Sequence, residues 1–205
     1  MLNIALPKGR LGDAAYRSFA DIGYACDGIE EENRKLIFED TDLGVRYILV
    51  KPADVAAYVE HGAADIGIVG KDIIMETEPD VFELFDMNIG RCFVAVSAKN
   101  DWRSDINRPL RVATKYPNIA RRYYAEKNMQ IEVIKLNGSI ELAPIVGLSD
   151  VIVDIVETGK TLEENDMRVY EKISDSSAWL IANKSSYRFK KERIDAIVRA
   201  LGGEI

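Results

Sequence analysis

Four short segments place cations, hydroxyl groups or glycine where a strand is expected to lead into a helix. They are Lys8-Gly9-Arg10, Lys51-Pro52, Lys115-Tyr116-Pro117 and Glu157-Thr158-Gly159-Lys160-Thr161. In parallel α/β folds, ligands bind where strands end, and the first backbone N–H groups of the next helix favour anions. The segments therefore indicate binding of phosphate groups, although each one alone is also consistent with a turn that carries solvated charges.

The segment from Asp154 to Thr161 is the most informative of the four. It follows the apolar run Val151–Val156, which carries Asp154 near its end. Backbone N–H groups and two hydroxyl groups in such a turn suit a terminal phosphate monoester. The segment is not a Walker A loop, because Asp154 stands where that motif needs glycine. A carboxylate there can hold the vicinal hydroxyls of a ribose, directly or through Mg²⁺, so the pattern indicates a ribose 5-phosphate site. The alternative, a capped edge strand, fits poorly with a carboxylate inside an apolar run.

The composition excludes several other kinds of site. Of 205 residues, 47% are hydrophobic and 30% charged, as in folded globular proteins. The 27 Lys and Arg against 34 Asp and Glu give a net charge of −7, which disfavours general nucleic-acid binding. Cys26 and Cys92 form no CxxC pair and His61 is the only histidine, which excludes a disulfide framework, a zinc site and a Ser-His-Asp triad. We find no apolar run long enough to span a membrane and no signal peptide, and we expect a cytoplasmic protein.

The elements expected to position these segments alternate between strands and helices. We predict strands at residues 2–6, 45–50, 66–69, 92–97, 110–114, 131–136 and 151–156. We predict helices after Arg10, from Pro52, after Asn118, after Ser139, after Thr161 and over residues 187–201. This alternation predicts an α/β protein with largely parallel sheets and a break near Gly90. The spacing leaves open whether there are one or two sheets.

With these residues in view, the chain resembles the short form of the ATP phosphoribosyltransferase family, the first enzyme of histidine biosynthesis. The resemblance runs from Leu2 to about Tyr187 and rests on blocks in the family's order: 5–11, 34–36, 51–55, 64–72, 113–118, 135–141 and 154–162. It implies two α/β lobes similar to type II periplasmic binding proteins, with the active site in the interlobe cleft. Lobe one would comprise residues 1–90 plus 178–205, and lobe two residues 91–177 with the phosphoribosyl-binding loop.

The resemblance also implies a reaction and roles for individual residues. The family joins N1 of the adenine of ATP to C1 of 5-phosphoribosyl 1-pyrophosphate and releases pyrophosphate, with Mg²⁺ required. By this resemblance, Asp154 binds the ribose hydroxyls, the 5-phosphate is held by Thr158, Gly159, Lys160 and Thr161, and Glu157 is a substrate-binding residue of the same loop. Ser139 and Glu141 would line the same pocket. The cations expected at the pyrophosphate and triphosphate groups are Lys8, Arg10, Arg34, Lys51 and Lys115. Some relatives carry arginine where this chain has Lys51, so a bidentate contact would be lost there.

A partner is implied as well, and two alternatives stay open. Short forms of the family pair with a regulatory subunit that resembles histidyl-tRNA synthetase, and we expect that partner here. Because the last predicted helix ends at Leu201, we expect no histidine-binding domain within the chain. One alternative is a small-anion binding module on the same two-lobed fold, although neither a signal peptide nor a helix-turn-helix segment is visible. The other is a phosphoribosyltransferase with a different base acceptor, since no residue in the sequence identifies adenine independently.

Overall fold

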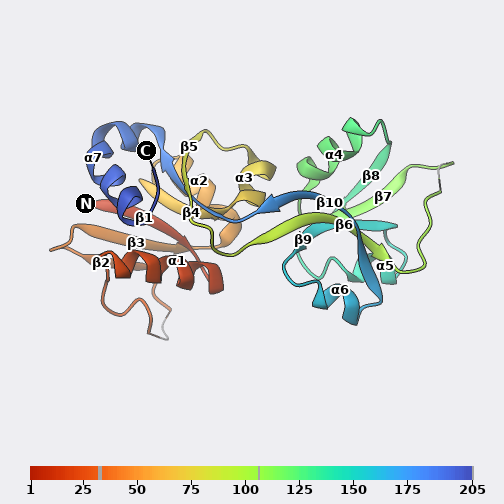
Figure 1. Cartoon of the computed structure of the whole chain (residues 1–205), viewed down its shortest axis with the longest axis horizontal. Helices are drawn as coiled ribbons and strands as arrows, with labels where there is room; N and C mark the ends of the chain where they lie inside the picture. Colours follow the sequence, from red (N-terminus) through yellow and green to blue (C-terminus); the bar gives the residue numbers. More distant parts are fainter. Residues whose placement is uncertain (32–33, 106, 205) are drawn as a thin grey trace. The chain divides into compact units, whose positions relative to one another are not determined.

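The computed structural model describes residues 1–31, 34–105 and 107–204, which form two compact units (Figure 1). Unit 1 comprises the described residues of Met1–Ile74, Glu78–Gly90 and Ser177–Ile205. Unit 2 comprises Met75–Thr77 and the described residues of Arg91–Ser176. The lobe boundaries predicted from the sequence fall after residues 90 and 177, close to these transitions. The assignment of residues 75–77 to unit 2 is a feature that the sequence did not indicate.

Unit 1 is built on a six-stranded mixed sheet with strand order β2-β3-β1-β4-β11-β5. Its elements are β1 (Leu2–Pro7), α1 (Arg10–Asp21), β2 (Ile37–Asp40), β3 (Val45–Val50), the 3₁₀ helix η1 (Pro52–Asp54), α2 (Val55–Glu60), β4 (Ile66–Gly70), β5 (Val81–Asp86), β11 (Ala178–Asn183) and α7 (Lys184–Ala200). The helix α3 (Lys71–Thr77) begins in unit 1, and its last three residues belong to unit 2. β1 pairs in parallel with β3 and with β4, while β2, β11 and β5 run antiparallel to their neighbours. The carboxyl ends of β3, β1 and β4 therefore lie at one edge of this sheet.

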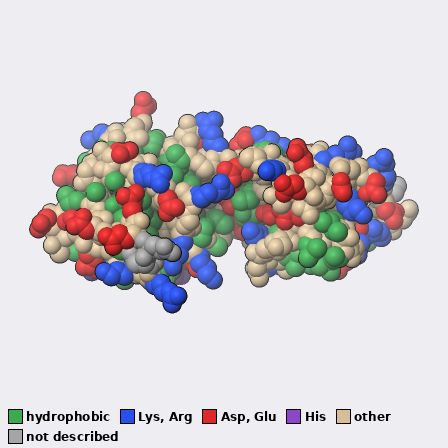
Figure 2. Space-filling model, turned by 90° about the horizontal axis from the view of Figure 1, so that it is seen from below, with side chains coloured by type: hydrophobic (Ala, Val, Ile, Leu, Met, Phe, Trp, Pro, Cys, Tyr) green, Lys and Arg blue, Asp and Glu red, His purple; other side chains and the backbone are tan. Residues whose placement is uncertain are grey.

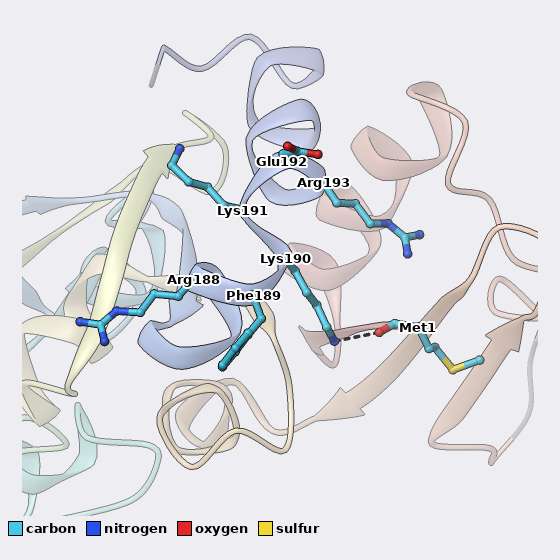
Figure 3. Close-up of a pocket in the computed structure, with 7 residues that line it drawn as sticks. All are labelled: Met1, Arg188, Phe189, Lys190, Lys191, Glu192 and Arg193. Atoms are coloured by element: carbon cyan, nitrogen blue, oxygen red, sulfur yellow. Dashed lines mark hydrogen bonds between the residues drawn. The ribbon is translucent and has the colours of Figure 1, made fainter.

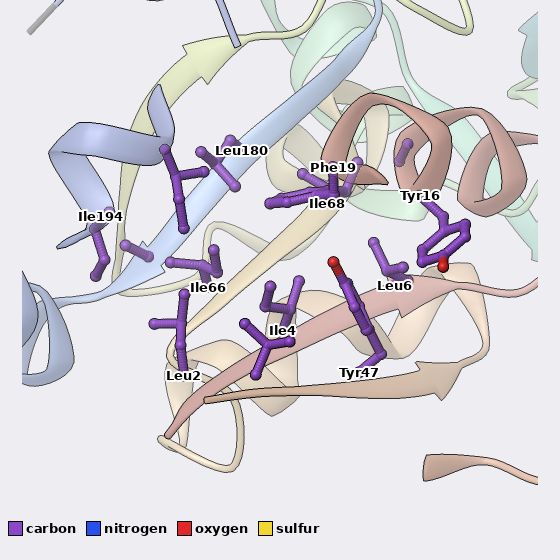
Figure 4. Packing of buried hydrophobic residues seen from close by; sticks show 14 of the residues in the cluster. Leu2, Ile4, Leu6, Tyr16, Phe19, Tyr47, Ile66, Ile68, Leu180 and Ile194 are labelled. Carbon is purple, nitrogen blue, oxygen red and sulfur yellow. The ribbon is translucent and has the colours of Figure 1, made fainter. Parts of the chain in front are cut away.

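Two apolar layers cover the two faces of that sheet. Leu2, Ile4 and Leu6 alternate along β1 and so point to one face, where Phe19 of α1 and Ile194 of α7 pack against them (Figure 4). The other face is covered by a second cluster that includes three buried residues of α2: Val55, Ala56 and Val59. Unit 1 is thus a three-layer structure, with α1 and α7 on one face of the sheet and α2 on the other.

Unit 2 is built on a five-stranded mixed sheet with strand order β10-β6-β9-β7-β8. Its elements are β6 (Cys92–Lys99), β7 (Leu110–Thr114), α4 (Pro117–Glu126), β8 (Ile131–Lys135), α5 (Leu142–Ile145), β9 (Val151–Val156), α6 (Lys160–Glu164) and β10 (Met167–Ser176). β7 pairs in parallel with β8 and with β9, whereas β6 runs antiparallel to β9 and β10. One face of the sheet packs against Ala143 of α5 and Leu162 of α6, both buried.

The structure confirms the predicted strands, corrects two other predictions and adds elements that were not predicted. The sheets are mixed rather than largely parallel, because β2, β5, β10 and β11 were not predicted and all four pair in antiparallel fashion. The helix α3 was also missed. The last helix begins at Lys184 rather than at residue 187, because Asn183 Oδ1 accepts the backbone N–H groups of Ser185 and Ser186 as an N-cap. Within the ranges that the structure describes, no helix is long and apolar enough to cross a membrane.

Candidate functional site

Unit 2 brings its predicted site residues to one edge of its sheet. In the parallel part of the sheet, Thr114 at the end of β7 pairs with Lys135 at the end of β8 and with Val153 near the end of β9. The loops that follow these three strands therefore begin at the same edge. Those loops carry Lys115 after β7, Ser139 and Glu141 after β8, and residues 157–161 after β9. This is the edge at which ligands bind in parallel α/β sheets.

Asp154 lies on the face of the unit 2 sheet that α5 and α6 cover. It pairs with Ala95 of β6 and shares a face with Ile152 and Val156, which belong to the core cluster on that side. Its side chain is half-buried, and its Oδ1 accepts the backbone N–H of Ile155 at 2.9 Å. A carboxylate at the rim of an apolar core is a costly placement. This position is consistent with a ligand-binding role for Asp154 next to the loops that lead into α5 and α6.

The turn after β9 has the geometry of a tight strand-to-helix connection. Gly159 has a φ of +78°, a left-handed conformation that favours glycine, and α6 begins at the next residue. The N–H of Lys160 donates to Thr158 Oγ1 at 3.4 Å, and the N–H of Glu163 donates to the Gly159 carbonyl at 3.1 Å. In a helix the first N–H groups have no acceptor within the helix itself, so those of Thr161 and Leu162 are not taken up by hydrogen bonds within α6. Both threonine side chains are exposed, as a phosphate-binding turn requires.

The Lys160 side chain contributes less to this turn than the sequence suggested. Its ammonium group lies 3.7 Å from the Glu164 carboxylate one helical turn away, and 77% of the side chain is exposed. A charge so solvated interacts weakly at a distance. The backbone and the hydroxyl groups are therefore the stronger candidates for phosphate binding in the turn.

Ser139 and Glu141 are held in place by the short helix α5. Ser139 has a φ of +47°, which is uncommon for a residue other than glycine, and such residues cluster at functional sites. Its carbonyl accepts the N–H of Leu142 at 3.1 Å, and Ile140 between the two polar residues is buried in the core. The exposed Ser139 and the half-buried Glu141 are thus fixed by the packing of the residues around them.

The loop after β7 is anchored by contacts that the sequence did not indicate. Thr114 is fully buried, and its hydroxyl donates to the Val153 carbonyl at 2.6 Å and accepts the N–H of Tyr116 at 2.8 Å. At the start of α4, the N–H groups of Asn118 and Ile119 donate to the Glu76 carboxylate, at 3.0–3.1 Å. The expectation that this helix start offers its N–H groups to a polyphosphate is therefore not met in this structure, because a carboxylate of unit 2 already accepts them.

The cations predicted in unit 1 lie at the carboxyl edge of its parallel strands. Lys8 follows β1 and Lys51 follows β3, and the N–H of Lys8 donates to the Val50 carbonyl at 2.8 Å. Arg34 comes before β2, which runs antiparallel to β3, and the N–H of Leu49 donates to the Leu36 carbonyl at 2.8 Å. The antiparallel register carries Arg34 toward the Lys51 end of β3. In the part of the chain that the structure describes, Lys8, Arg34 and Lys51 are exposed and form no ion pair.

Two glycines allow α1 to start directly at this edge. Gly9 has a φ of +97° and precedes Arg10, the exposed first residue of α1. One turn later, a Cβ on Gly12 would lie 1.6 Å from the Pro7 carbonyl oxygen, so only glycine lets the helix pack against the strand end. The backbone between β1 and α1 is therefore built to place Lys8 and Arg10 next to each other at the edge of the sheet.

Lys71 is a further cation at this edge that was not proposed from the sequence. It follows β4, the third parallel strand. The segment Gly70-Lys71 resembles the other strand ends, and this similarity was the sequence signal that could have identified Lys71 as a candidate. Its ammonium group, however, is ion-paired with Glu83 and lies 4.7 Å from the ring centroid of Trp179. Its charge is therefore compensated within unit 1, unlike those of Lys8, Arg34 and Lys51.

A pocket of about 660 Å³ lies at the opposite edge of the unit 1 sheet (Figure 3). It is lined by Met1, which precedes β1, and by residues 188–193 of α7. Lys190 donates to the Met1 carbonyl and to Asp65, Lys191 pairs with Asp195, and Arg193 donates to the Leu43 carbonyl. Since most of its cations already have partners and it lies at the amino ends of β1 and β4, we do not assign this pocket to the substrates.

The sequence and the fold of this chain are similar to those of known proteins. The profile of the ATP phosphoribosyltransferase family matches residues 51–203. The chain is 56% identical over 200 residues to the ATP phosphoribosyltransferase of Brachyspira hyodysenteriae, covering 97% of each protein. It is 53% identical to that of Clostridioides difficile, over 97% of this chain and 95% of the relative. Among solved structures it is similar to the ATP phosphoribosyl transferase (HisG:HisZ) complex from Thermotoga maritima, with a TM-score of 0.87, 35% identity and coverage of 98% of this chain and 97% of that one.

Proposed function

The chain belongs to the ATP phosphoribosyltransferase family, and from that premise we propose how its residues divide the work of the family's reaction. In this reaction, N1 of the adenine of ATP displaces pyrophosphate from C1 of 5-phosphoribosyl 1-pyrophosphate. The products are N1-(5-phosphoribosyl)-ATP and pyrophosphate, in the first step of histidine biosynthesis. Both substrates are polyanions, so the protein must supply separate groups for the sugar phosphate, the leaving pyrophosphate and the triphosphate.

The phosphoribosyl group binds at the carboxyl edge of the unit 2 sheet. The observation that carries this assignment is the strand β9, which presents Asp154 on the α5–α6 face and continues directly into the turn at Thr158–Thr161. The hydroxyls of Thr158 and Thr161 and the N–H groups of the turn take the 5-phosphate. Asp154 accepts hydrogen bonds from the ribose hydroxyls, and Glu157, Ser139 and Glu141 complete the polar rim.

The cations of unit 1 bind the pyrophosphate and triphosphate groups. Lys8, Arg34 and Lys51 suit this role because no carboxylate within the described residues neutralises them, and Arg10 lies beside Lys8 at the start of α1. Lys115 of unit 2 is exposed after β7 and adds a further cation. As the C1–O bond breaks, negative charge develops on the departing pyrophosphate, and fixed cations stabilise that charge more in the transition state than in the bound substrate.

The attack on C1 needs no general base. Adenine N1 carries a lone pair and no proton, so bond formation releases no proton that a side chain must accept. The sugar passes through an oxocarbenium-like transition state in which the C1–O bond breaks ahead of attack. Catalysis then consists of positioning two substrates and stabilising a leaving group. This fits a site whose candidate residues are cations, hydroxyls and carboxylates and which includes no histidine or thiol.

Mg²⁺ would be held together with the pyrophosphate and triphosphate groups of the substrates. The chain's own oxygen donors fit a supporting role, because carboxylates are the side chains that Mg²⁺ prefers, and Asp154, Glu157 and Glu141 lie on strands or loops at the same edge of unit 2. Within the described ranges, no group of three or more His, Cys, Asp or Glu side chains is arranged to hold a metal ion by itself. When bound, the ion neutralises phosphate oxygens and so makes pyrophosphate a better leaving group.

The chain works with a regulatory subunit of the HisZ type, and it works in the cytoplasm, where both substrates are made. The support for the partner is the HisG:HisZ complex from Thermotoga maritima, whose aligned chain is matched over 97% of its length. This subunit resembles histidyl-tRNA synthetase. Its role is to raise turnover and to confer inhibition by histidine.

The test is an assay of the purified chain with ATP, 5-phosphoribosyl 1-pyrophosphate and Mg²⁺. The absorbance of N1-substituted adenine and the release of pyrophosphate are followed together, with and without the regulatory subunit. We expect both signals to rise in step. Pyrophosphate release with other purine or pyrimidine nucleotides but not with ATP would identify a different base acceptor. Binding of the sugar phosphate without any turnover would identify a binding module instead.

A further inference from the structure

Two loops at the carboxyl edge of the unit 2 sheet lead from neighbouring strands into helices. One connects β7 to α4, and the other connects β9 to α6. β7 and β9 pair in parallel, with Thr114 at the end of β7 opposite Val153 of β9. Adjacent strands lie about 5 Å apart, so the two loops begin at adjoining positions. If both were open, a phosphate group would be attracted to either one.

The start of α4, however, is filled by a carboxylate of unit 2. Pro117, the first residue of α4, has no N–H, so the first N–H groups belong to Asn118 and Ile119. Both donate to the Glu76 carboxylate at 3.0–3.1 Å. The next N–H, that of Ala120, donates to a backbone carbonyl at 3.0 Å. The N–H groups that this helix start would offer to an anion therefore already have acceptors within the chain.

Further contacts hold Glu76 against α4. Its backbone carbonyl accepts the side-chain amide of Asn118 at 3.0 Å, and the carbonyl of Met75 accepts the guanidinium group of Arg122. The Glu76 side chain is half-buried. Both the main chain and the side chain of this segment thus contact α4, which is consistent with the assignment of residues 75–77 to unit 2. The carboxylate is therefore a fixed part of the α4 start.

Without Glu76, the charge around the α4 start would favour anions. Lys115, Arg121 and Arg122 lie within eight residues of sequence and are exposed, and a helix start itself carries partial positive charge. On the face of unit 2 seen in Figure 2, acidic and basic side chains are intermixed, so no broad field of one sign decides where an anion binds. The charge at the α4 start then depends on its direct neighbours, and the Glu76 carboxylate offsets the positive end of the helix and repels phosphate.

The turn after β9 has no such carboxylate on its N–H groups. Among the residues that the structure describes, no group accepts the N–H groups of Thr161 and Leu162. This turn also follows the strand that carries Asp154, which we place at the ribose hydroxyls. Of the two adjoining loops, the one that is aligned with Asp154 is open and the other is closed by Glu76.

We propose that Glu76 determines where the sugar phosphate binds, because its carboxylate fills the α4 start and so directs the 5-phosphate to the turn at Thr158–Thr161. This inference rests on the proposed function, which supplies the substrate. A 5-phosphate held at the α4 start would displace the ribose from Asp154 by one strand, and a displaced ribose does not react. Glu76 is thus a specificity-determining residue that excludes a nonproductive binding mode.

The first experiment measures anion binding at the α4 start directly. Glu76→Ala removes the acceptor, whereas Glu76→Gln keeps the length and one acceptor oxygen but no charge and so preserves the fold if alanine loosens α4. Inorganic phosphate is titrated into each variant while NMR follows the amide signals of Asn118 and Ile119. We expect phosphate to bind there at least tenfold more tightly in Glu76→Ala and about threefold more tightly in Glu76→Gln than in the unchanged chain.

The matched control is Glu126→Ala. It removes an exposed carboxylate at the last residue of the same helix and changes the net charge equally, but it leaves the α4 start intact. Its amide signals at Asn118 and Ile119 should respond to phosphate as those of the unchanged chain do.

The second experiment uses steady-state kinetics with 5-phosphoribosyl 1-pyrophosphate as the varied substrate. Because the two loops adjoin, a sugar phosphate bound at the α4 start blocks the productive turn and is not itself converted. Both kcat and KM should therefore fall by the same factor in Glu76→Ala, at least threefold, while kcat/KM stays unchanged. A purely structural role of Glu76 would not lower KM. Glu126→Ala should keep both constants.

Two results would overturn this inference. One is the absence of tighter phosphate binding at Asn118 and Ile119 in both Glu76 variants. The other is a rise in KM with a fall in kcat/KM, which would show that Glu76 only supports the structure of the α4 start. If the unchanged chain does not convert the sugar substrate at all, the proposed function itself is contradicted. The phosphate titration needs no turnover and so separates that result from a failure of the role assigned to Glu76.

Discussion

At the scale of single residues, the candidate phosphoribosyl site depends on a few groups with different physical tasks. Gly159 supplies a backbone conformation, Thr158 and Thr161 supply hydroxyls, and Asp154 supplies a charge on the α5–α6 face. Because these tasks differ, single substitutions can separate them. The exposure of the two threonines also means that replacing them leaves the core unchanged.

Replacing Thr161 by alanine should weaken binding of 5-phosphoribosyl 1-pyrophosphate more than tenfold and leave the affinity for ATP almost unchanged. The lost contact is a hydrogen bond to a charged phosphate, which contributes about 1.5–3 kcal/mol. Thr158→Ala should behave in the same way. Isothermal titration with each substrate measures both effects, and Thr41→Ala, an exposed threonine in a turn of unit 1, is the matched control. Unchanged affinity for the sugar substrate in both variants would place its phosphate elsewhere.

Asp154→Asn keeps the shape of the side chain and removes its charge. If the carboxylate holds the ribose hydroxyls or supports their Mg²⁺, turnover should fall by orders of magnitude while the fold is retained, because the group acts on the reacting sugar. Steady-state kinetics together with circular dichroism checks this. Asp166→Asn, an exposed acid in the turn after α6, is a suitable comparison. A folded and fully active Asp154→Asn enzyme is incompatible with the assigned role.

At the scale of secondary structure, unit 2 is stabilised by carboxylates that join elements far apart in the sequence. Glu76 accepts the first N–H groups of α4 and so supports the loop that carries Lys115. Asp150, just before β9, accepts hydrogen bonds from Arg108 at 2.7 Å and from the Arg111 side chain at 2.9 Å. The Asp150 side chain is only 8% exposed. It therefore fixes the start of β9 to β7, and β9 is the strand that ends at the candidate phosphate-binding turn.

Asp150 should make the stability of the protein sensitive to acid. The hydrogen bond from Arg108, together with those from Arg111, lowers the pKa of Asp150 well below its ordinary value. Its contribution is therefore fully present above the pKa of the unfolded carboxyl, about 4, and is lost as the pH falls through the lower folded value. Asp150→Asn should cost about 2–3 kcal/mol of unfolding free energy near neutral pH.

Urea unfolding between pH 7 and pH 2 measures this effect. The difference between the unchanged chain and Asp150→Asn should shrink as the pH falls below about 4, because protonation then neutralises Asp150 in the unchanged chain, whereas the asparagine is uncharged at every pH. The control is Asp175→Asn, which breaks an exposed ion pair with Lys172 and should change stability by less than about 1 kcal/mol. A difference that stays constant across the whole pH range would mean that the Asp150 charge does not contribute.

At the scale of the whole molecule, the proposed function divides catalysis and regulation between two kinds of chain. The chain matches its curated relatives from Brachyspira hyodysenteriae and Clostridioides difficile over 97% and 95% of their lengths, and its two units contain the proposed substrate groups. We propose that control by histidine belongs to the regulatory subunit. The isolated chain and the complex should therefore respond differently to the end product of the pathway.

Millimolar histidine should leave the turnover of the isolated chain unchanged and should inhibit the complex with the regulatory subunit. An effector such as histidine changes activity only if it binds the more active and the less active state of the enzyme with different affinities. The proposed histidine site is on the regulatory subunit, so the isolated chain should not respond. Parallel assays of the two preparations with a histidine titration decide this. Strong inhibition of the chain without its partner would show that it carries a histidine site of its own.

The sequence by itself determined the features that are local. Largely apolar segments of four to six residues located β1, β3, β4 and the strands β6 to β9, and glycine or proline near their ends located several of the loops. Since ligands bind at the carboxyl ends of parallel strands, those loops gave the candidate site residues directly, among them Lys8, Lys51, Asp154 and Thr161. The blocks that resemble the ATP phosphoribosyltransferase family supplied the substrates, which the residues alone indicated only as a ribose 5-phosphate.

The tertiary structure decided the features that depend on pairing between distant segments. The strands β5 and β10 carry charged residues and are largely exposed or half-buried, so their apolar pattern is weak, and only pairing with β11 and β6 defines them. Arg34 reaches the Lys51 end of β3 only through the antiparallel register of β2. Lys71 lies at the same edge as Lys8, but Glu83 and Trp179, which the fold brings to it, compensate its charge. The secondary structure of a segment depends largely on residues that are close in the sequence. Whether the charge of a side chain is compensated depends on residues that are close in space, and only the folded chain specifies which residues these are.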